Sequence, residues 1–153
     1  MSQTKLTHAP DLTQRPPRSA RVRLGGYAIL PRMLDKGRAT LMGKNGEYHF
    51  NCPLDQHVVN FIGLDAEALQ AELALGKGDE EILQWITEHA QHPRTPWEIA
   101  AWSSYQDARG PTDVETREFF NAYLGRLSKT REDIAGWFDV LDLDDYVSYG
   151  GKA

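Results

Sequence analysis

Apolar residues recur at helical spacing along most of the chain, and they predict a fold built almost entirely of helices. Between residues 28 and 42 the apolar stripe begins at Ile29 and ends at Leu41, and Pro31 is compatible with the first turn of such a helix. Six further helical patterns follow, beginning near residues 53, 65, 79, 95, 112 and 130. We therefore predict an all-α, compact bundle of about six to seven helices.

Polar residues mark where these helices begin. Asp65 and Asp79 precede two of the patterns and are typical N-caps. Residues 95–98, 112–115 and 130–133 each start with Thr and carry an acidic residue three positions later, the pattern of a capping box. Each box predicts the start of a helix.

Two stretches near the N-terminus lack the helical period. Residues 1–19 contain three prolines and several basic residues, so we predict an extended basic arm followed by a single helical domain at 20–153. Leu6 and Leu12 could anchor this arm. Residues 44–52 combine an Asn-Gly turn with alternating polar and apolar residues, which would allow one short β-ribbon. The segment from Ala20 to the Gly25-Gly26 pair looks helical, with a bend at the two glycines.

Composition and length indicate the class of protein and its compartment. The chain has 153 residues, of which 41% are hydrophobic and 25% charged, as expected for one ordinary globular domain. Its single cysteine excludes an internal disulfide framework. The first ten residues carry no apolar run of the signal-peptide kind, and no segment approaches the roughly 20 apolar residues of a membrane span. These features predict a cytoplasmic protein without a membrane partner.

The charges are unevenly distributed along the chain. Residues 1–50 hold nine Lys or Arg and three acidic residues, whereas residues 51–153 hold eight basic and nineteen acidic residues. The basic segment could lie across the acidic body of its own chain, or across that of a second copy in a homodimer. A nucleic-acid partner is disfavoured, because the acidic body repels phosphate and no nucleic-acid-binding motif is present.

The same segment offers a candidate anion site. Arg32, Asp35 and Arg38 are spaced three apart on the predicted helix, so Asp35 could orient both guanidinium groups. Lys36, with Tyr27 or Tyr48, would complete a site for a small anionic molecule or a protein partner. The absence of a catalytic motif favours such a non-catalytic binding module. The alternative is that these charges are ordinary solvated pairs on a helix surface.

A second group of reactive residues lies between residues 49 and 57. His49, Cys52, Asp55 and His57 could form a small enzyme site that uses acid–base or thiol chemistry, with the arginines as clamps. The spacing matches no zinc site, so no metal is predicted, and no cofactor can be named. His57 falls on the apolar stripe of its helix, where a core histidine is expected instead of a ligand.

The second half of the chain holds most of the large aromatic residues. Trp97 and Tyr105 share one side of a predicted helix, and at this spacing a role in the core is favoured over a ligand pocket. The acidic residues 139–145 are expected to form a solvated helix end. Tyr146 and Tyr149 would form a terminal turn that docks on the N-terminal arm.

Four segments also point to a family. They are DLTQRPPRS, RLGGYAILPRMLDKGRA, GEYHFNCPLDQHVVNFIG and WFDVLDLDDYVSYGGK. Together they resemble the bacterial domain-of-unknown-function family DUF5069, from about Asp11 to Lys152. The resemblance implies a small single-domain bacterial protein and no activity to transfer. It places the search for function in the matched segments.

Overall fold

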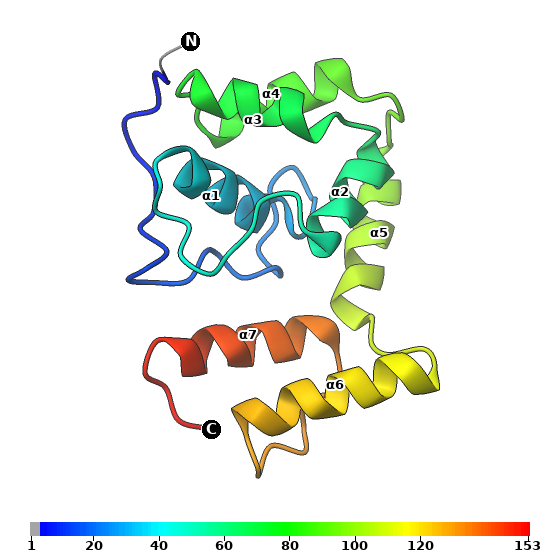
Figure 1. Cartoon of the computed structure of the whole chain (residues 1–153). Coiled ribbons are helices and arrows are strands. Elements are labelled where there is room, and N and C mark those ends of the chain that lie inside the picture. Colours follow the sequence, from blue (N-terminus) through cyan, green and yellow to red (C-terminus); the bar gives the residue numbers. More distant parts are fainter. Residues whose placement is uncertain (1–3) are drawn as a thin grey trace.

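The computed structural model describes residues 4–153, and within that range it consists of seven helices without a sheet (Figure 1). The helices are α1 (Leu30–Leu41), α2 (Pro53–Ile62), α3 (Ala66–Ala74), α4 (Asp79–His89), α5 (Pro96–Ala108), α6 (Val114–Leu127) and α7 (Trp137–Ser148). The prediction of an all-α bundle is confirmed. None of these seven helices has both the length and the apolar character needed to cross a membrane.

Several predicted helix starts are confirmed by their caps. The Asp65 carboxylate accepts hydrogen bonds from the first-turn amides of α3, and Thr95 and Glu98 form the predicted capping box of α5. At α6 the prediction is wrong by one residue, because Asp113 and Thr116 form the box. Aspartate accepts from the N3 amide as well as threonine does, so the shifted box caps α6 equally well.

The predicted helix start at residues 130–133 is wrong. Residues 128–136 form a loop, and α7 begins at Trp137 after Gly136. The backbone N–H of Trp137 donates to the carbonyl of Arg109, which ties the start of α7 to the end of α5. The Gly136 N–H also donates to the Asp139 carboxylate, so a distant contact and a local cap together hold the start of α7.

The predicted helix at Ala20 is also wrong, whereas the bend at the glycine pair is confirmed. Residues 20–29 form turns and one isolated bridge between Leu24 and Tyr27. Gly25 and Gly26 have φ angles of 59° and 85°, in the left-handed region that glycine adopts without strain. A side chain at Gly25 would also collide with Leu83. The glycine pair therefore folds the segment back before α1.

The predicted β-ribbon at residues 44–52 is wrong. The backbone N–H of Tyr48 donates to the carbonyl of Asn45, and that of Lys44 donates to the carbonyl of Ala39 at the end of α1. No strand is present in residues 4–153 to pair with this segment. Local turns and the end of α1 satisfy its backbone groups instead.

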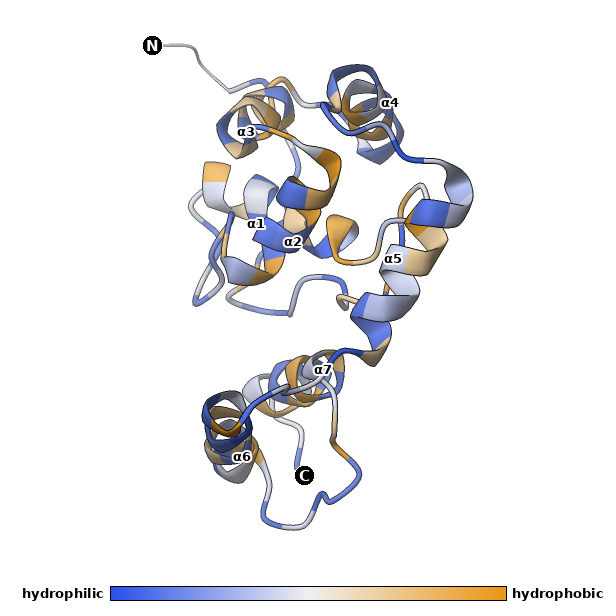
Figure 2. Cartoon of the chain, turned by 90° about the vertical axis from the view of Figure 1, so that its right-hand side faces the viewer, coloured by the Kyte–Doolittle hydropathy of each residue, from blue (hydrophilic) through white to orange (hydrophobic). Residues whose placement is uncertain are grey.

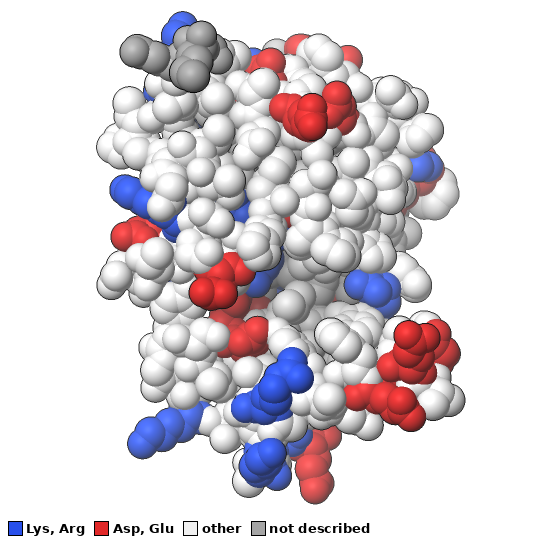
Figure 3. Space-filling view, viewed as in Figure 1, with Lys and Arg blue, Asp and Glu red and all other residues white. Residues whose placement is uncertain are grey.

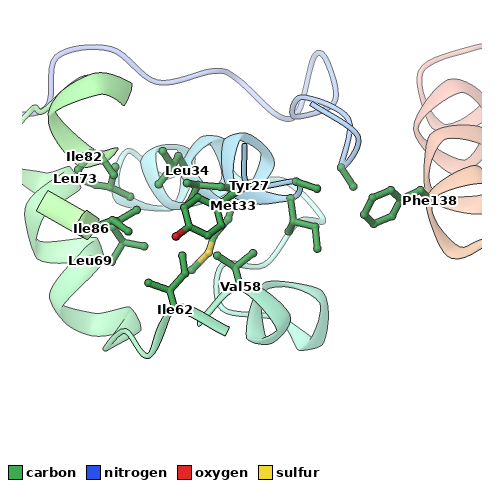
Figure 4. Packing of buried hydrophobic residues seen from close by; sticks show 14 residues of the cluster. Tyr27, Met33, Leu34, Val58, Ile62, Leu69, Leu73, Ile82, Ile86 and Phe138 are labelled. Atoms are coloured by element: carbon green, nitrogen blue, oxygen red, sulfur yellow. The ribbon is translucent and has the colours of Figure 1, made fainter. Parts of the chain in front are cut away.

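Helix α1 lies at the centre of the body that α1–α5 form, and α6 and α7 lie together below this body (Figures 1 and 2). The buried apolar cluster joins residues of α1, α2, α3 and α4, including Met33, Ile62, Leu73 and Ile86 (Figure 4). Phe138 of α7 is fully buried and belongs to the same cluster. One continuous core therefore extends from the body to α7.

The N-terminal segment packs onto the helices, so it is not a projecting arm. The Lys5 amide donates to the carbonyl of Ala74 at the end of α3, and Leu12 is almost fully buried. Residues 11–15 make a turn, so the segment is not extended throughout. The Tyr149 hydroxyl donates to the carbonyl of Leu12, which confirms that the C-terminal turn docks here. Residues 1–3 of the predicted arm lie outside the described range.

The charge asymmetry is resolved within the chain. Six basic residues before residue 50 bind carboxylates that follow it, in the pairs Arg18–Asp79, Arg21–Asp139 and Asp142, Arg23–Asp107, Arg32–Asp145, Lys36–Asp55, and Arg38–Asp79. Figure 3 accordingly shows basic and acidic groups interspersed on the viewed face. The first interpretation, a basic segment lying across the acidic body of its own chain, is confirmed.

Candidate functional site

A pocket of about 690 Å³ lies between α1, the loop at residues 46–52 and α7, and we call it the α1–α7 pocket. In Figure 1 this loop crosses the space between the two helices. The pocket is lined by Leu12, Thr13, Arg32, Lys36, Gly46, Glu47, Tyr48, His49, Cys52, Leu54, Leu141, Asp144, Asp145, Ser148 and Tyr149. Its size is that of a small-molecule site, and it combines apolar walls with a few polar groups.

One end of the pocket is built around the ammonium group of Lys36. Lys36 Nζ lies 3.0 Å from Asp55 Oδ1 and 3.2 Å from Cys52 Sγ. The side chains of Lys36 and Asp55 are 3% and 0% exposed, so this ion pair is buried. The second carboxylate oxygen of Asp55 accepts the backbone N–H of Asn51 at 2.9 Å. Lys36 is therefore held in place as a buried cation beside the cysteine.

Cys52 occupies the N-cap position of α2 and is partly accessible from the pocket. The preceding residue, Asn51, has φ of 60°, a left-handed conformation that asparagine tolerates better than most residues. This turn brings the sulfur beside the ammonium group of Lys36.

The other end of the pocket is organised by Asp145 of α7. Its carboxylate accepts hydrogen bonds from Arg32 Nη1 at 2.7 Å and from the Tyr48 hydroxyl at 2.7 Å. The Arg32 guanidinium also lies 5.4 Å from the centre of the Tyr48 ring. Asp145 is 8% exposed, so the expectation of a solvated helix end is wrong for this residue. The sequence shows the acidic cluster but not that α7 turns this carboxylate toward α1.

The protonation states at this end follow from the same contacts. Burial alone would lower the pKa of Arg32, but its hydrogen bonds and charge interaction with Asp145 outweigh burial and raise the pKa. Burial, followed by the neighbouring carboxylate of Asp145, raises the pKa of the Tyr48 hydroxyl. Arg32 is thus a permanent cation, and Tyr48 a permanent hydrogen-bond donor.

The structure does not bring all of the predicted anion site together. Asp35 binds the backbone and side chain of Arg18, and Arg38 binds Asp79 at 2.8 Å, both away from the pocket. The prediction that Asp35 orients its two helical neighbours is therefore wrong. Arg18 lies outside the helix, and its bidentate contact with the Asp35 carboxylate replaces the pairs with Arg32 and Arg38 that the spacing predicted.

Two more predicted site residues lie elsewhere. Tyr27 makes a T-shaped ring contact with Phe61 at the core. His57 faces α5, where its Nδ1 lies 3.4 Å from Gln106 Nε2. Burial, and then the nearby charge of Arg109, lower the pKa of His57. The expectation of a core histidine is therefore wrong, because His57 is only half-buried and lies outside the apolar cluster.

His49 lines the pocket and is exposed to solvent. Across residues 4–153 no hydrogen bond links it to Cys52, although both side chains reach the same pocket. The part of the chain that the structure describes also contains no group of three or more His, Cys, Asp or Glu side chains placed to hold a metal ion. Of the predicted residues, the pocket thus brings together Arg32, Lys36, Tyr48, His49 and Cys52, with Asp55 directly behind Lys36.

The comparisons with known proteins give a family without an activity. A family model described as "Domain of unknown function (DUF5069)" matches residues 14–147. The match includes most of the residues that line the α1–α7 pocket, from Arg32 on α1 to Asp145 on α7. No curated protein matches the chain.

Proposed function

The chain belongs to the DUF5069 family, whose description assigns no activity, and we propose from the geometry of the site that it is a binding protein for a small organic acid. The observation that carries this proposal is the α1–α7 pocket of about 690 Å³ with two buried cations, Arg32 and Lys36, in its wall. We further propose that it acts in the bacterial cytoplasm, where the free thiol of Cys52 would remain reduced.

The cations are suited to bind an anion because their positions are fixed before a ligand arrives. Asp145 holds Arg32 and Asp55 holds Lys36, and neither contact uses all of the N–H donors of the cation. An ammonium group has three donors, and those of Lys36 have two recorded partners. The cost of ordering these long side chains is already met in the folded protein.

The other lining residues limit the kind of anion. Glu47, Asp144 and Asp145 also line the pocket, so it is not uniformly basic. A ligand with negative charge along its whole length would be repelled near α7. Apolar contacts are available from Leu54 and Leu141. These features favour a monoanionic acid, with its carboxylate near Lys36 and an uncharged body.

A pair of probes tests the charge and the apolar body together. Benzoate is expected to raise the melting temperature, whereas benzamide, which has the same shape without the charge, is not. At ten times the dissociation constant, binding stabilises by about 1.4 kcal/mol, or about 3–6 °C for a chain of this size. Equal protection by both probes would argue against an anion site, and protection by neither would argue against the proposal.

Matched variants locate the site. Ser148 is exposed at the rim of the pocket, and its replacement by Trp should obstruct entry and abolish protection by benzoate. Thr87 on α4 provides the control, because it too is an exposed helical hydroxyl residue whose side chain bonds within its own helix. Thr87→Trp should leave the protection unchanged.

The contact between Lys36 and Cys52 favours a second candidate, which is thiol chemistry in the same pocket. Lys36 Nζ lies 3.2 Å from the sulfur, which is the arrangement of an activated nucleophile. Iodoacetamide would then label native protein at Cys52, with loss of iodide, faster than it labels the unfolded chain. A thiol that reacts only after unfolding would exclude this candidate and leave the binding proposal intact.

A further inference from the structure

Helix α5 presents an uncharged face to solvent. None of the exposed residues of α5 is Lys, Arg, Asp or Glu. The exposed residues are Pro96, Trp97, Ala100, Ala101, Ser104, Tyr105 and Ala108. Trp97 and Tyr105 are 72% and 61% exposed, so the expectation that they belong to the core is wrong. Figure 2 views the molecule onto α5, and no other element lies in front of this helix.

The opposite side of the same helix packs on the body, where Ile99 and Trp102 contact the apolar cluster and the Trp102 ring stacks on Phe61. Ser103 and Gln106 are its most buried residues, and both are hydrogen-bonded. The Ser103 hydroxyl accepts the Ala28 amide at 2.9 Å and donates to the carbonyl of Gly26 at 2.6 Å. A surface helix normally buries its apolar face and exposes its polar one. Helix α5 departs from this rule, because Ile99 and Trp102 pack inward while Trp97 and Tyr105 remain exposed on the other side. An apolar surface on both sides of a helix indicates a second packing partner.

We propose that this partner is a second copy of the chain. The contact surface is the α5 stripe, which we define as Trp97, Ala101, Tyr105 and Ala108, and the two helices run antiparallel about a two-fold axis near Ala101. Trp97 and Tyr105 each lie four residues from Ala101. The two-fold axis therefore places Trp97 of one copy against the partner's Tyr105, and Tyr105 of that copy against the partner's Trp97.

The composition of the stripe favours self-association over other partners. It carries no charge, so an identical copy meets no repulsion, and an acidic or basic partner would find no complementary group. Alanine at the centre allows two helices to approach to about 8 Å. The small residue at the axis and the aromatic residues on either side thus fit one another in the antiparallel pair.

The area available is sufficient for a reversible dimer. Trp97 and Tyr105 are 72% and 61% exposed, so about two thirds of the roughly 150–250 Å² of each aromatic side chain can still be buried, and four rings take part. With the small residues between them, the interface reaches at most about 1,000 Å², the size of weak, transient protein interfaces. We therefore expect a dimer that dissociates on dilution.

Sedimentation velocity of the full chain, over about 1–100 µM, tests the proposal. We expect a mass that rises toward twice the 17.3 kDa of the chain. Ala101→Glu places two carboxylates together at the axis and should leave only monomer. Ala71 of α3 is also an exposed helical alanine, so Ala71→Glu is the matched control and should still dimerise. A monomeric wild type, or a dimer unaffected by Ala101→Glu, would overturn the proposal.

Cysteine cross-linking tests the register of the two helices. In a Cys52→Ser background, Ala101→Cys lies beside its own copy at the axis and should form an intermolecular disulfide on oxidation. Ala108→Cys lies on the same stripe but seven residues from the two-fold axis. The two copies of residue 108 are therefore about 21 Å apart along the helices, and Ala108→Cys should form no intermolecular disulfide. Cross-linking at 108 and not at 101 would overturn the antiparallel arrangement.

Because the α5 stripe and the α1–α7 pocket share no residue, Ala101→Glu should still be protected by benzoate, which separates this test from that of the binding function.

Discussion

Replacing Lys36 with Met is the perturbation whose energetic effect is best defined by the structure. It removes the only cation that contacts the buried carboxylate of Asp55 in residues 4–153. The Asp55 side chain is 0% exposed and does not line the pocket, so water cannot take over the role of the ammonium group at this carboxylate. Removing one partner of a buried ion pair typically costs about 3–5 kcal/mol. The expected loss is therefore a large share of the roughly 5–15 kcal/mol that stabilises a domain.

Urea unfolding measures this loss directly. With a slope of about 2 kcal/mol per molar, the midpoint should fall by about 2 M. Lys77→Met is the matched control, because the pair between Lys77 and Glu72 is 30% and 21% exposed and should contribute less than about 1 kcal/mol. Combining Lys36→Met with Asp55→Asn removes both charges and should cost less than Lys36→Met alone. A loss below about 1 kcal/mol for Lys36→Met would refute the reasoning, as would simple additivity in the double variant.

Three further predictions concern stability. Because burial lowers the pKa of His57 below 6.5, the unfolded chain takes up this proton before the folded one, so stability is full above that value and falls as the pH drops below it. The His57→Gln variant should lose this share of the pH dependence in thermal unfolding. Ser103→Ala leaves the buried Ala28 amide and the partly buried Gly26 carbonyl without their partner and should lower the free energy of unfolding by about 1–3 kcal/mol, whereas Ser104→Ala at the exposed neighbouring position should not. Asp79→Asn weakens the bonds to two arginines and should cost about 1–3 kcal/mol at neutral pH. Burial alone would raise the pKa of Asp79, but the arginines lower it, so the stability that this carboxylate provides is present above about 3.8 and the difference from wild type should shrink as the pH falls through that value.

Local signals in the sequence were sufficient for most of the helices. Apolar periodicity and the caps at Asp65 and Thr95 are properties of a few neighbouring residues, and the structure confirms them. The errors arose where distant contacts decide the outcome. The start of α7 is held by the bond between Trp137 and Arg109 and by the cap between Gly136 and Asp139, and no pattern within residues 130–133 carries that information.

The pocket was predictable only in part, for the same reason. Arg32, Lys36 and Cys52 stand out because unusual residue types occur together before and after the turn at residues 44–46. Asp145 does not stand out, because an acidic residue in an acidic helix normally faces solvent. Only the packing of α7 against the body, through buried Phe138, brings this carboxylate to α1.

The exposed aromatic face of α5 shows a further limit of helical periodicity. The spacing of Trp97, Ala101 and Tyr105 correctly groups these residues on one side of a helix. It does not reveal which side faces the core, because Ser103 and Gln106 are buried through specific hydrogen bonds to other segments. A pattern of this kind identifies a packing face without identifying what covers it.

The proposal that the α1–α7 pocket binds a small organic acid is tested most directly by a titration of isotope-labelled protein with benzoate, followed through its backbone amide resonances. The account predicts saturable shifts at Lys36, Tyr48 and Cys52 and none at Trp97 or Tyr105 on α5. Benzamide should produce no such shifts at equal concentration. Saturable shifts confined to other surfaces, or no shift with benzoate at any residue of the pocket, would contradict it.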